Sequence, residues 1–242
     1  MTGAVADYRR LAAVGPYFAL DAAASPAEVP PAGFRPLREL YAQGPDGPLA
    51  ERVRVVARRL GTAELRVAAS ILHLGLAARF CSVGLGSAVL LGTVPALDPD
   101  RAQVRVPEQG PIDLWTPYET HEASETHRPR EHLADRLHQV LVQGQLAPLA
   151  AAVRAAVPLA GKLLDGNAAS ALAGALRMVE AHAAPGGARA LVAELLRRPP
   201  LAGTGTLRST GFRRTSCCLY YRVGPGAGVC GDCCFDSPPR RP

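Results

Sequence analysis

Residues 64–83 have the sequence ELRVAASILHLGLAARFCSV and carry a helical pattern on which the interpretation of the fold depends. Their apolar side chains recur at the spacing of one helix face and form a continuous stripe. The stripe consists of Leu65, Ala68, Ala69, Leu72 and Leu76. We therefore predict a core helix here, against which other elements of the chain pack.

The overlapping stretch from Phe80 to Leu97 has no charged residue and approaches the length of a transmembrane helix. Glycines and a proline interrupt this apolar run, and its pattern is amphipathic, so a buried helix is favoured over a membrane span. The interruptions are Gly84, Gly86, Gly92 and Pro95. We expect the helix to break near Gly84 and to resume as SAVLLG, and we expect no transmembrane segment.

Amphipathic patterns predict further helices on both sides of this region. They cover Leu49–Leu60, Arg130–Gln143, Leu146–Ala156, Lys162–Ala183 and Ala188–Arg197. Alternation at period two in Gln103–Val106 and Ile112–Thr116 predicts one small β-hairpin, at about residues 103–116. The first 48 residues are rich in proline and are expected to be irregular. The fold class is mainly α: a helical body with one small β-hairpin and a C-terminal cysteine-rich segment.

We expect two domains of unequal size. Pro199, Pro200 and the glycines and threonines of Gly203–Thr206 are typical of a hinge. Residues 1–200 would form the helical body, and residues 201–242 would form the cysteine-rich segment.

Five of the six cysteines lie in that segment, within 18 residues. They are Cys217, Cys218, Cys230, Cys233 and Cys234. Near the N-terminus, Asp7 and Arg9 stand where a signal peptide would need an apolar stretch, so we expect a cytoplasmic protein. Disulfides are rare in the cytoplasm, and thiolates at short spacing bind a soft metal or an iron–sulfur cluster. The segment is therefore interpreted as a metal-binding or cluster-binding site.

The cysteines form two pairs that could converge on one centre. Cys230 and Cys233 form a C-x-x-C turn, in which Gly231 relieves backbone crowding. Cys217 and Cys218 are adjacent, and neighbouring side chains on an extended strand point to opposite faces, so the chain must bend there if both serve one centre. The connecting loop is able to fold one pair onto the other because it contains Gly224, Pro225, Gly226 and Gly228.

Four thiolates satisfy either a [2Fe–2S] cluster or a tetrahedral zinc ion. A structural zinc ribbon normally has C-x-x-C on both sides, or histidines, and a two-iron cluster offers two attachment points for adjacent cysteines. The chemistry therefore favours the cluster. Structural zinc is the second interpretation, and a thiol–disulfide relay is the third.

The segment GFRRTSCCLYYRVGPGAGVCGDC, residues 211–233, resembles the FhuF-like ferric-siderophore reductases. The hallmark of that family is a C-terminal CC-x10-CxxC motif whose cysteines hold an unusual [2Fe–2S] cluster. The resemblance implies Cys217, Cys218, Cys230 and Cys233 as the cluster ligands. Eleven residues separate the pairs here instead of ten, and the glycine–proline loop can absorb the extra residue. Three upstream blocks are also similar to blocks of the family: ILHLGLAARFCSVGLGSAVL, GPIDLW and LLDGNAASALAGAL.

The resemblance implies an oxidoreductase that reduces a ferric siderophore, of hydroxamate type, by one electron and releases Fe(II) in the cytoplasm. The protein could also associate with the inner face of the cell membrane. An external ferredoxin or flavoprotein reductase would supply the electron, because the chain has no GxGxxG unit for a dinucleotide. The alternative is a non-catalytic helical protein that binds a siderophore or metabolite and holds structural zinc at its cysteines.

Several residues are candidate contacts with the substrate or with the electron donor. Arg213 and Arg214 lie nearest to Cys217 and could offset the negative charge of a cluster or dock an anionic partner. A solvated basic segment is the plainer interpretation. The other candidates, each of which could equally serve packing or solvation, are Arg208, Arg222, Tyr220, Tyr221 and Asn167.

The remaining cysteines and histidines have structural interpretations. Cys81 and His73 lie on an apolar helix and are expected in the core, and Cys234 is expected to be a buried or spare thiol. Four histidines fall between Glu119 and His138, but their spacing matches no ligand template, so a polar loop is favoured over a second metal site. They are His121, His127, His132 and His138.

The net charge of +6 does not by itself indicate a nucleic-acid partner. Lys162 is the only lysine, aromatic residues are few, and no nucleic-acid-binding module interleaves them with the arginines. We therefore expect no nucleic-acid partner.

Overall fold

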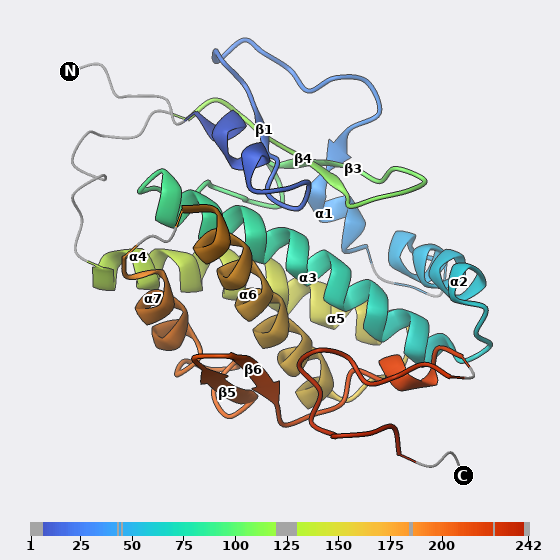
Figure 1. The fold of residues 1–242 in the computed structure, drawn as a ribbon. Coiled ribbons are helices and arrows are strands. Elements are labelled where there is room, and N and C mark those ends of the chain that lie inside the picture. Colours follow the sequence, from blue (N-terminus) through green and yellow to red (C-terminus); the bar gives the residue numbers. More distant parts are fainter. Residues whose placement is uncertain are drawn as a thin grey trace.

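Helix α3 (Leu65–Leu90) runs through the middle of the protein and contacts most of the other helices (Figure 1). This computed structural model describes residues 7–42, 44, 46–119, 130–183, 186–224 and 226–239. The predicted mainly helical fold is confirmed. Among the described helices only α3 is long and apolar enough to cross a membrane, but 78% of that apolar window is buried inside the protein.

The predicted break near Gly84 is wrong, because α3 continues without interruption to Leu90. Gly84 and Gly86 serve close packing instead. A Cβ atom at Gly86 would lie 2.7 Å from the ring of Phe18, and one at Gly84 would lie 3.5 Å from Leu137. Backbone hydrogen bonds keep the helix continuous, while the missing side chains let neighbouring elements approach it.

Three other long helical segments surround α3. Helix α6 (Gly161–Ala183) packs along α3, and α2 (Pro48–Leu60) packs against it as well. Helix α4 (Arg130–Leu137) leads through a π-helix, η3 (His138–Leu146), into α5 (Ala147–Ala156). The two helices predicted between residues 130 and 156 are therefore one continuous helical run. Helix α7 (Ala188–Leu195) follows α6, as predicted.

The predicted hairpin is confirmed as strands β3 (Gln103–Arg105) and β4 (Asp113–Thr116), which pair antiparallel. It belongs to a larger sheet of order β1-β4-β3-β2. The outer strands are β1 (Asp21–Ala22), parallel to β4, and β2 (Arg35–Pro36), antiparallel to β3. Each outer strand has two residues, which is too short for a periodic pattern. The N-terminal region also contains the 3₁₀ helix η1 (Tyr8–Ala13) and the one-turn helix α1 (Leu37–Leu40).

The buried side chain of Arg79 connects α3 to the N-terminal region and to the sheet. Its guanidinium donates to the carbonyl oxygens of Tyr17 at 2.7 Å, of Ile112 at 2.8 Å, and of Ala19. Burial lowers the pKa of Arg79 to about 10, so the group remains charged at neutral pH. These carbonyls fix the sheet on α3.

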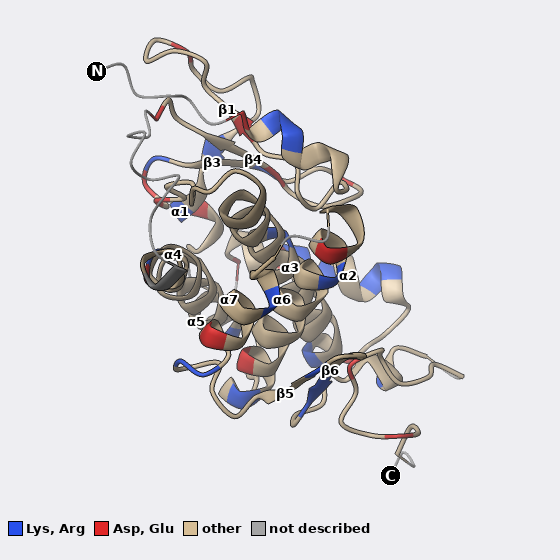
Figure 2. Ribbon diagram, turned by 60° about the vertical axis from the view of Figure 1, so that its left-hand side comes forward, with Lys and Arg blue, Asp and Glu red and all other residues tan. Residues whose placement is uncertain are grey.

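The segment after residue 200 begins with a second hairpin that the sequence analysis does not anticipate. Strands β5 (Gly205–Arg208) and β6 (Gly211–Arg214) pair antiparallel and lie against α6. Beyond them, apart from the 3₁₀ turn η4 (Tyr220–Arg222), the chain is irregular. This segment lies at the opposite end of the molecule from the β1–β4 sheet (Figures 1 and 2). Leu201 and Phe212 belong to the main hydrophobic core, and the division into two domains at residue 200 stays a prediction.

Candidate iron–sulfur site

The four candidate ligands lie on two turns that follow β6. Cys217 and Cys218 come three and four residues after the end of the strand, and Cys230 and Cys233 lie on the loop beyond η4. Arg214, the last residue of β6, donates its backbone N–H to the carbonyl oxygen of Asp232 at 2.9 Å. This bond joins the strand directly to the C-x-x-C turn, so the two cysteine pairs are held side by side.

The bend required beside the adjacent cysteines occurs at Leu219. Its φ of 66° places it in the left-handed region, and among the described residues it is the one non-glycine residue there. The turn lets the backbone N–H of Leu219 donate to the sulfur of Cys217 at 3.2 Å. The sequence predicts that the chain must bend here if Cys217 and Cys218 are to serve one centre. The turn at Leu219 provides that bend.

Backbone N–H groups two residues further along donate to the sulfurs of Cys217 and Cys233. Besides the bond to Cys217, Phe235 donates to Cys233 at 3.4 Å. Backbone hydrogen bonds from Tyr220 and Asp232 likewise act on Cys218 and Cys230, and each favours the thiolate. Such bonds stabilise negative charge on sulfur and are among the factors that set the potential of an iron–sulfur cluster.

The sulfurs of Cys218 and Cys230 lie 3.4 Å apart. Two thiolates at about 2.3 Å from one tetrahedral metal would be about 3.8 Å apart, so this pair suits a single metal atom with little movement. No group of three or more His, Cys, Asp or Glu side chains among the described residues is gathered around one point. This pair could share one iron of a two-iron cluster, which takes two thiolates on each iron.

Thiol–thiol contacts dominate the pKa shifts within the site. A hydrogen bond from Cys218 lowers the pKa of Cys217, and the same contact raises the pKa of Cys218. The contact with Cys218 also raises the pKa of Cys230. These three thiols therefore lie close enough to one another to change each other's ionisation.

Arg214 is buried next to the cysteine turns with an incomplete set of partners, and Figure 2 shows the arginines of β6 in blue. Its side chain is 2% exposed. One nitrogen, Nη2, donates to the carbonyl oxygen of Leu163 at 3.2 Å, while Nε and Nη1 have no hydrogen-bond partner among the described residues. Its charge favours the thiolate forms of Cys218 and Cys230. A buried cation without a counter-charge is costly, and thiolates bound to a cluster would supply that charge, so the residues present fit the group.

Two residues of the core support the first cysteine turn from behind. The hydroxyl of Ser70 on α3 donates to the carbonyl oxygen of Cys218 at 2.7 Å. The amide of Asn167 on α6 donates to the carbonyl oxygen of Ser70 at 3.0 Å and to its hydroxyl at 3.2 Å. Asn167 is fully buried, so the structure places it behind the cysteines and not on a surface open to a substrate. Ser70 was not predicted from the sequence, because it is one of several buried polar residues on this largely apolar helix.

The two arginines at the edges of the loop are engaged within the protein. Arg222 binds Glu64, the residue that precedes α3, through three N–O contacts of 2.8 to 3.0 Å. Arg213 donates to the carbonyl oxygen of Cys234 at 3.3 Å and to Asp236 at 2.8 Å. Their first role in this structure is to fasten the cysteine loop. Arg213 is more exposed and retains a surface that a partner could contact.

Aromatic side chains cover the outside of the loop. Tyr221 meets Phe235 edge to face, with ring centroids 6.2 Å apart. Tyr220 is exposed beside them, and Phe235 is itself partly exposed. Arg208, at the end of β5, is exposed, and its carbonyl oxygen accepts a bond from Arg189. Of these residues, Tyr220, Tyr221 and Phe235 lie beside the cysteines.

The core interpretations of Cys81 and His73 agree with their burial. Burial raises the pKa of the Cys81 thiol. Burial, with the charge of Arg214, lowers the pKa of His73 to about 3, and neither ring nitrogen has a partner among the described residues. Cys234 is partly exposed.

The histidine segment shows no metal-binding geometry within the part that is described. His132 is exposed, and His138 contacts the carbonyl oxygen of Pro199 at 2.8 Å. His121 and His127 lie outside the described residues. A metal role for this segment stays untested.

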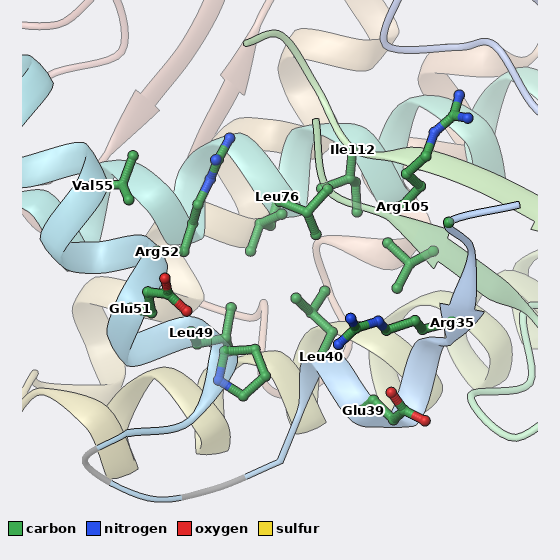
Figure 3. Close-up of a pocket in the computed structure, with 14 residues that line it drawn as sticks. Arg35, Glu39, Leu40, Leu49, Glu51, Arg52, Val55, Leu76, Arg105 and Ile112 are labelled. Atoms are coloured by element: carbon green, nitrogen blue, oxygen red, sulfur yellow. The ribbon is translucent and has the colours of Figure 1, made fainter. Parts of the chain in front are cut away.

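Besides a shallow hollow of about 660 Å³ at the end of α5, two hollows lie against the central helix α3. The first, of about 310 Å³, lies between α3 and α6 and includes Asp232 in its wall. The second, of about 390 Å³, lies between α2, α3 and the sheet and shares no lining residue with the cysteine loop (Figure 3). In the second, Arg35 and Arg52 reach over a floor that includes Leu40 and Leu76, and no ion pair to a described residue engages either arginine (Figure 3).

The cysteine segment matches a known iron–sulfur domain. Residues 214–235 match the family model described as the FhuF 2Fe-2S C-terminal domain, and this span contains all five clustered cysteines. The resemblance to FhuF-like proteins and the [2Fe–2S] cofactor are thereby confirmed. The match covers the cysteine segment alone, so the similarity of the upstream blocks stays a prediction. No curated protein matches the chain.

Proposed function

We propose that this protein is a ferric-siderophore reductase whose [2Fe–2S] cluster is held by Cys217, Cys218, Cys230 and Cys233. The observation that carries the proposal is the buried, incompletely paired Arg214 next to thiols that backbone N–H groups already bond. This arrangement stabilises negative charge at sulfur close to the protein surface.

The proposed reaction transfers one electron and forms no bond to the protein. When bound, the cluster supplies one-electron chemistry: an electron from an external donor passes to Fe(III) and yields Fe(II). Siderophores hold Fe(III), a hard ion, with oxygen donors and bind Fe(II) far less tightly, so iron leaves after the transfer. The side chains have to hold the cluster and shield it, and no general base or nucleophile is required.

We also propose an electron donor, a substrate class and a location for this reaction. The electron donor is a ferredoxin or a flavoprotein reductase, since the chain has no dinucleotide-binding motif of its own. The substrate is a hydroxamate-type ferric siderophore. We place the protein in the cytoplasm or at the inner face of the membrane, where imported siderophores arrive and reducing donors are present.

Formation of Fe(II) from a ferric trihydroxamate, trapped with a coloured ferrous chelator under anaerobic conditions, tests this function. The protein would be supplied with electrons from a ferredoxin and its reductase. We expect the wild-type protein to produce Fe(II) at least about tenfold faster than the donor system alone. Cys230→Ser should lose this activity, while Cys234→Ser, a matched change one residue beyond Cys233, should keep it. Equal rates for wild type and Cys230→Ser would contradict the proposal.

A further inference from the structure

A groove between α3 and α6 opens beside the C-x-x-C turn. It has a volume of about 310 Å³. Its lining includes Tyr17, Leu74, Ala78, Gly174, Met178 and Asp232. Most of its wall is hydrocarbon. At its rim, Tyr17 is 38% exposed and Met178 is 47% exposed, which is unusual for large apolar side chains.

Asp232 makes the groove continuous with the cluster-binding turn, because it lies between Cys230 and Cys233. Its carboxylate accepts a hydrogen bond from Ser170 and pairs with Arg177 at 3.1 Å. This pairing cancels the charge of the carboxylate and leaves the near end of the groove polar but close to neutral. The same residue therefore borders the proposed electron source on one side and the hollow on the other.

We infer that this groove is the place where the ferric siderophore binds. The inference rests on the proposed function. Electron tunnelling weakens steeply with distance, so the acceptor must bind beside the cluster, and this hollow borders the cysteine turn. The second cavity shares no residue with that turn.

The charge of the groove gives the class of complex. Three singly charged hydroxamates neutralise Fe(III), whereas three doubly charged catecholates leave a complex with a charge of −3. Entering the groove would remove water from this trianion, and the apolar walls offer no unpaired cation in exchange. Binding of the tricatecholate complex would therefore be unfavourable, because removing water from a charge is costly. A neutral complex with a hydrocarbon backbone matches the walls and loses little on entering. The electron count is unchanged: Fe(III) gains one electron from the ferredoxin or flavoprotein donor, and Fe(II) departs.

Gly174 allows the groove to be filled without disturbing the helix. A Cβ atom there would have one neighbour, a guanidinium nitrogen of Arg177 at 3.8 Å, so Gly174→Leu projects into open space. The matched control is Gly75→Leu on α3, where a Cβ atom meets nothing within 4 Å and which does not line the groove. Both changes replace a glycine by leucine inside a helix, so the effect on helix propensity is the same in each.

The first test measures binding of the redox-inert gallium(III) trihydroxamate by calorimetry, and KM for the iron complex. Gly174→Leu should weaken gallium-complex binding and raise KM at least about tenfold, with an unchanged cluster spectrum and an unchanged rate toward ferricyanide. Gly75→Leu should resemble the wild type in every measurement. Met178→Glu, at the exposed rim, should also raise KM and carries little risk to folding. A ferric tricatecholate should be reduced more slowly than the trihydroxamate by the wild type.

The outcomes separate this inference from the proposed function. If the wild type reduces no ferric complex, the proposed function is wrong. If it reduces the trihydroxamate but Gly174→Leu leaves KM and gallium binding unchanged, the groove is not the site and this inference alone fails. A rise in KM with Arg52→Gln instead would place the substrate in the second cavity. Slower electron delivery from the donor in Gly174→Leu, with gallium binding unchanged, would mean that the groove docks the donor.

Discussion

The guanidinium of Arg222 binds the carboxylate of Glu64 through both oxygen atoms, across 158 residues of sequence. Glu64 precedes the central helix α3, and Arg222 ends the 3₁₀ turn between the two cysteine pairs. The pair therefore fastens the cysteine loop to the central helix of the fold. Arginine suits this position because its planar group matches a carboxylate.

Glu64→Gln should loosen this attachment and leave the rest of the fold intact. We expect the melting temperature of the holoprotein to fall by a few degrees and cluster loss to become faster, because the loop is held by fewer contacts. The matched control is Asp100→Asn, which breaks the exposed pair between Arg38 and Asp100 and should change neither measurement. Equal cluster lifetimes in the two variants would contradict this role of Glu64.

The same ion pair predicts the direction of a pH dependence. The hydrogen bond from Arg222 lowers the pKa of Glu64 below its ordinary value, so the pair stabilises the folded protein above the pKa that Glu64 has when unfolded. This contribution is lost as the pH falls through the lowered pKa. The difference in melting temperature between wild type and Glu64→Gln should therefore be constant near neutral pH and shrink below about pH 4. A difference that grew on acidification would show that the pair is not the cause.

Arg214→Gln should lower the midpoint potential of the cluster. Reduction adds negative charge, which the buried guanidinium stabilises. If the separation is taken to be on the order of 8 Å and the effective dielectric constant about 20, Coulomb's law gives about 2 kcal/mol, or about 90 mV for one electron. Arg214→Lys keeps the charge and should restore most of the potential. A redox titration followed by electron paramagnetic resonance makes the comparison, and an unchanged potential in Arg214→Gln would show that Arg214 does not act on the cluster.

Leu219→Pro should prevent stable cluster assembly, because proline has no N–H to donate to Cys217 and its ring fixes φ at a negative value. Leu219→Asn is the control, since asparagine tolerates the left-handed conformation and keeps the N–H. We expect iron and acid-labile sulfide to be near two atoms each per chain in the asparagine variant and well below one in the proline variant. Full occupancy in Leu219→Pro would mean that the bend is not required.

The sequence predicts those parts of the fold in which a local pattern is long enough to be read. Periodic apolar residues define α2, α3, α6 and α7, and alternation defines the β3–β4 hairpin. The two-residue strands β1 and β2 have no such pattern. The β5–β6 hairpin is missed because its glycines and threonines are equally typical of a linker. The break predicted at Gly84 is absent. Gly84 makes room for the side chain of Leu137, and in the sequence such a glycine looks the same as one that ends a helix.

In the candidate site, too, only the features that depend on local sequence could be predicted. Cysteine spacing is sufficient to propose the ligands, and the need for a bend follows from the adjacent pair. The supporting residues cannot be read in this way, because their partners are distant in sequence. Ser70 meets Cys218, and Asn167 is buried behind it. Arg222 is paired with Glu64, a partner that the sequence does not indicate, and its candidate role as a contact of the substrate or donor stays a prediction.

The visible spectrum of protein purified without oxygen tests the central claim most directly. It would be recorded as isolated, after reduction with dithionite and removal of the excess, and again after one equivalent of ferric trihydroxamate is added. We predict a brown protein that bleaches on reduction and regains its colour with the complex, with one Fe(II) formed per cluster. A colourless protein with stoichiometric zinc and no acid-labile sulfide, or a reduced cluster that the ferric complex does not reoxidise, would contradict the account.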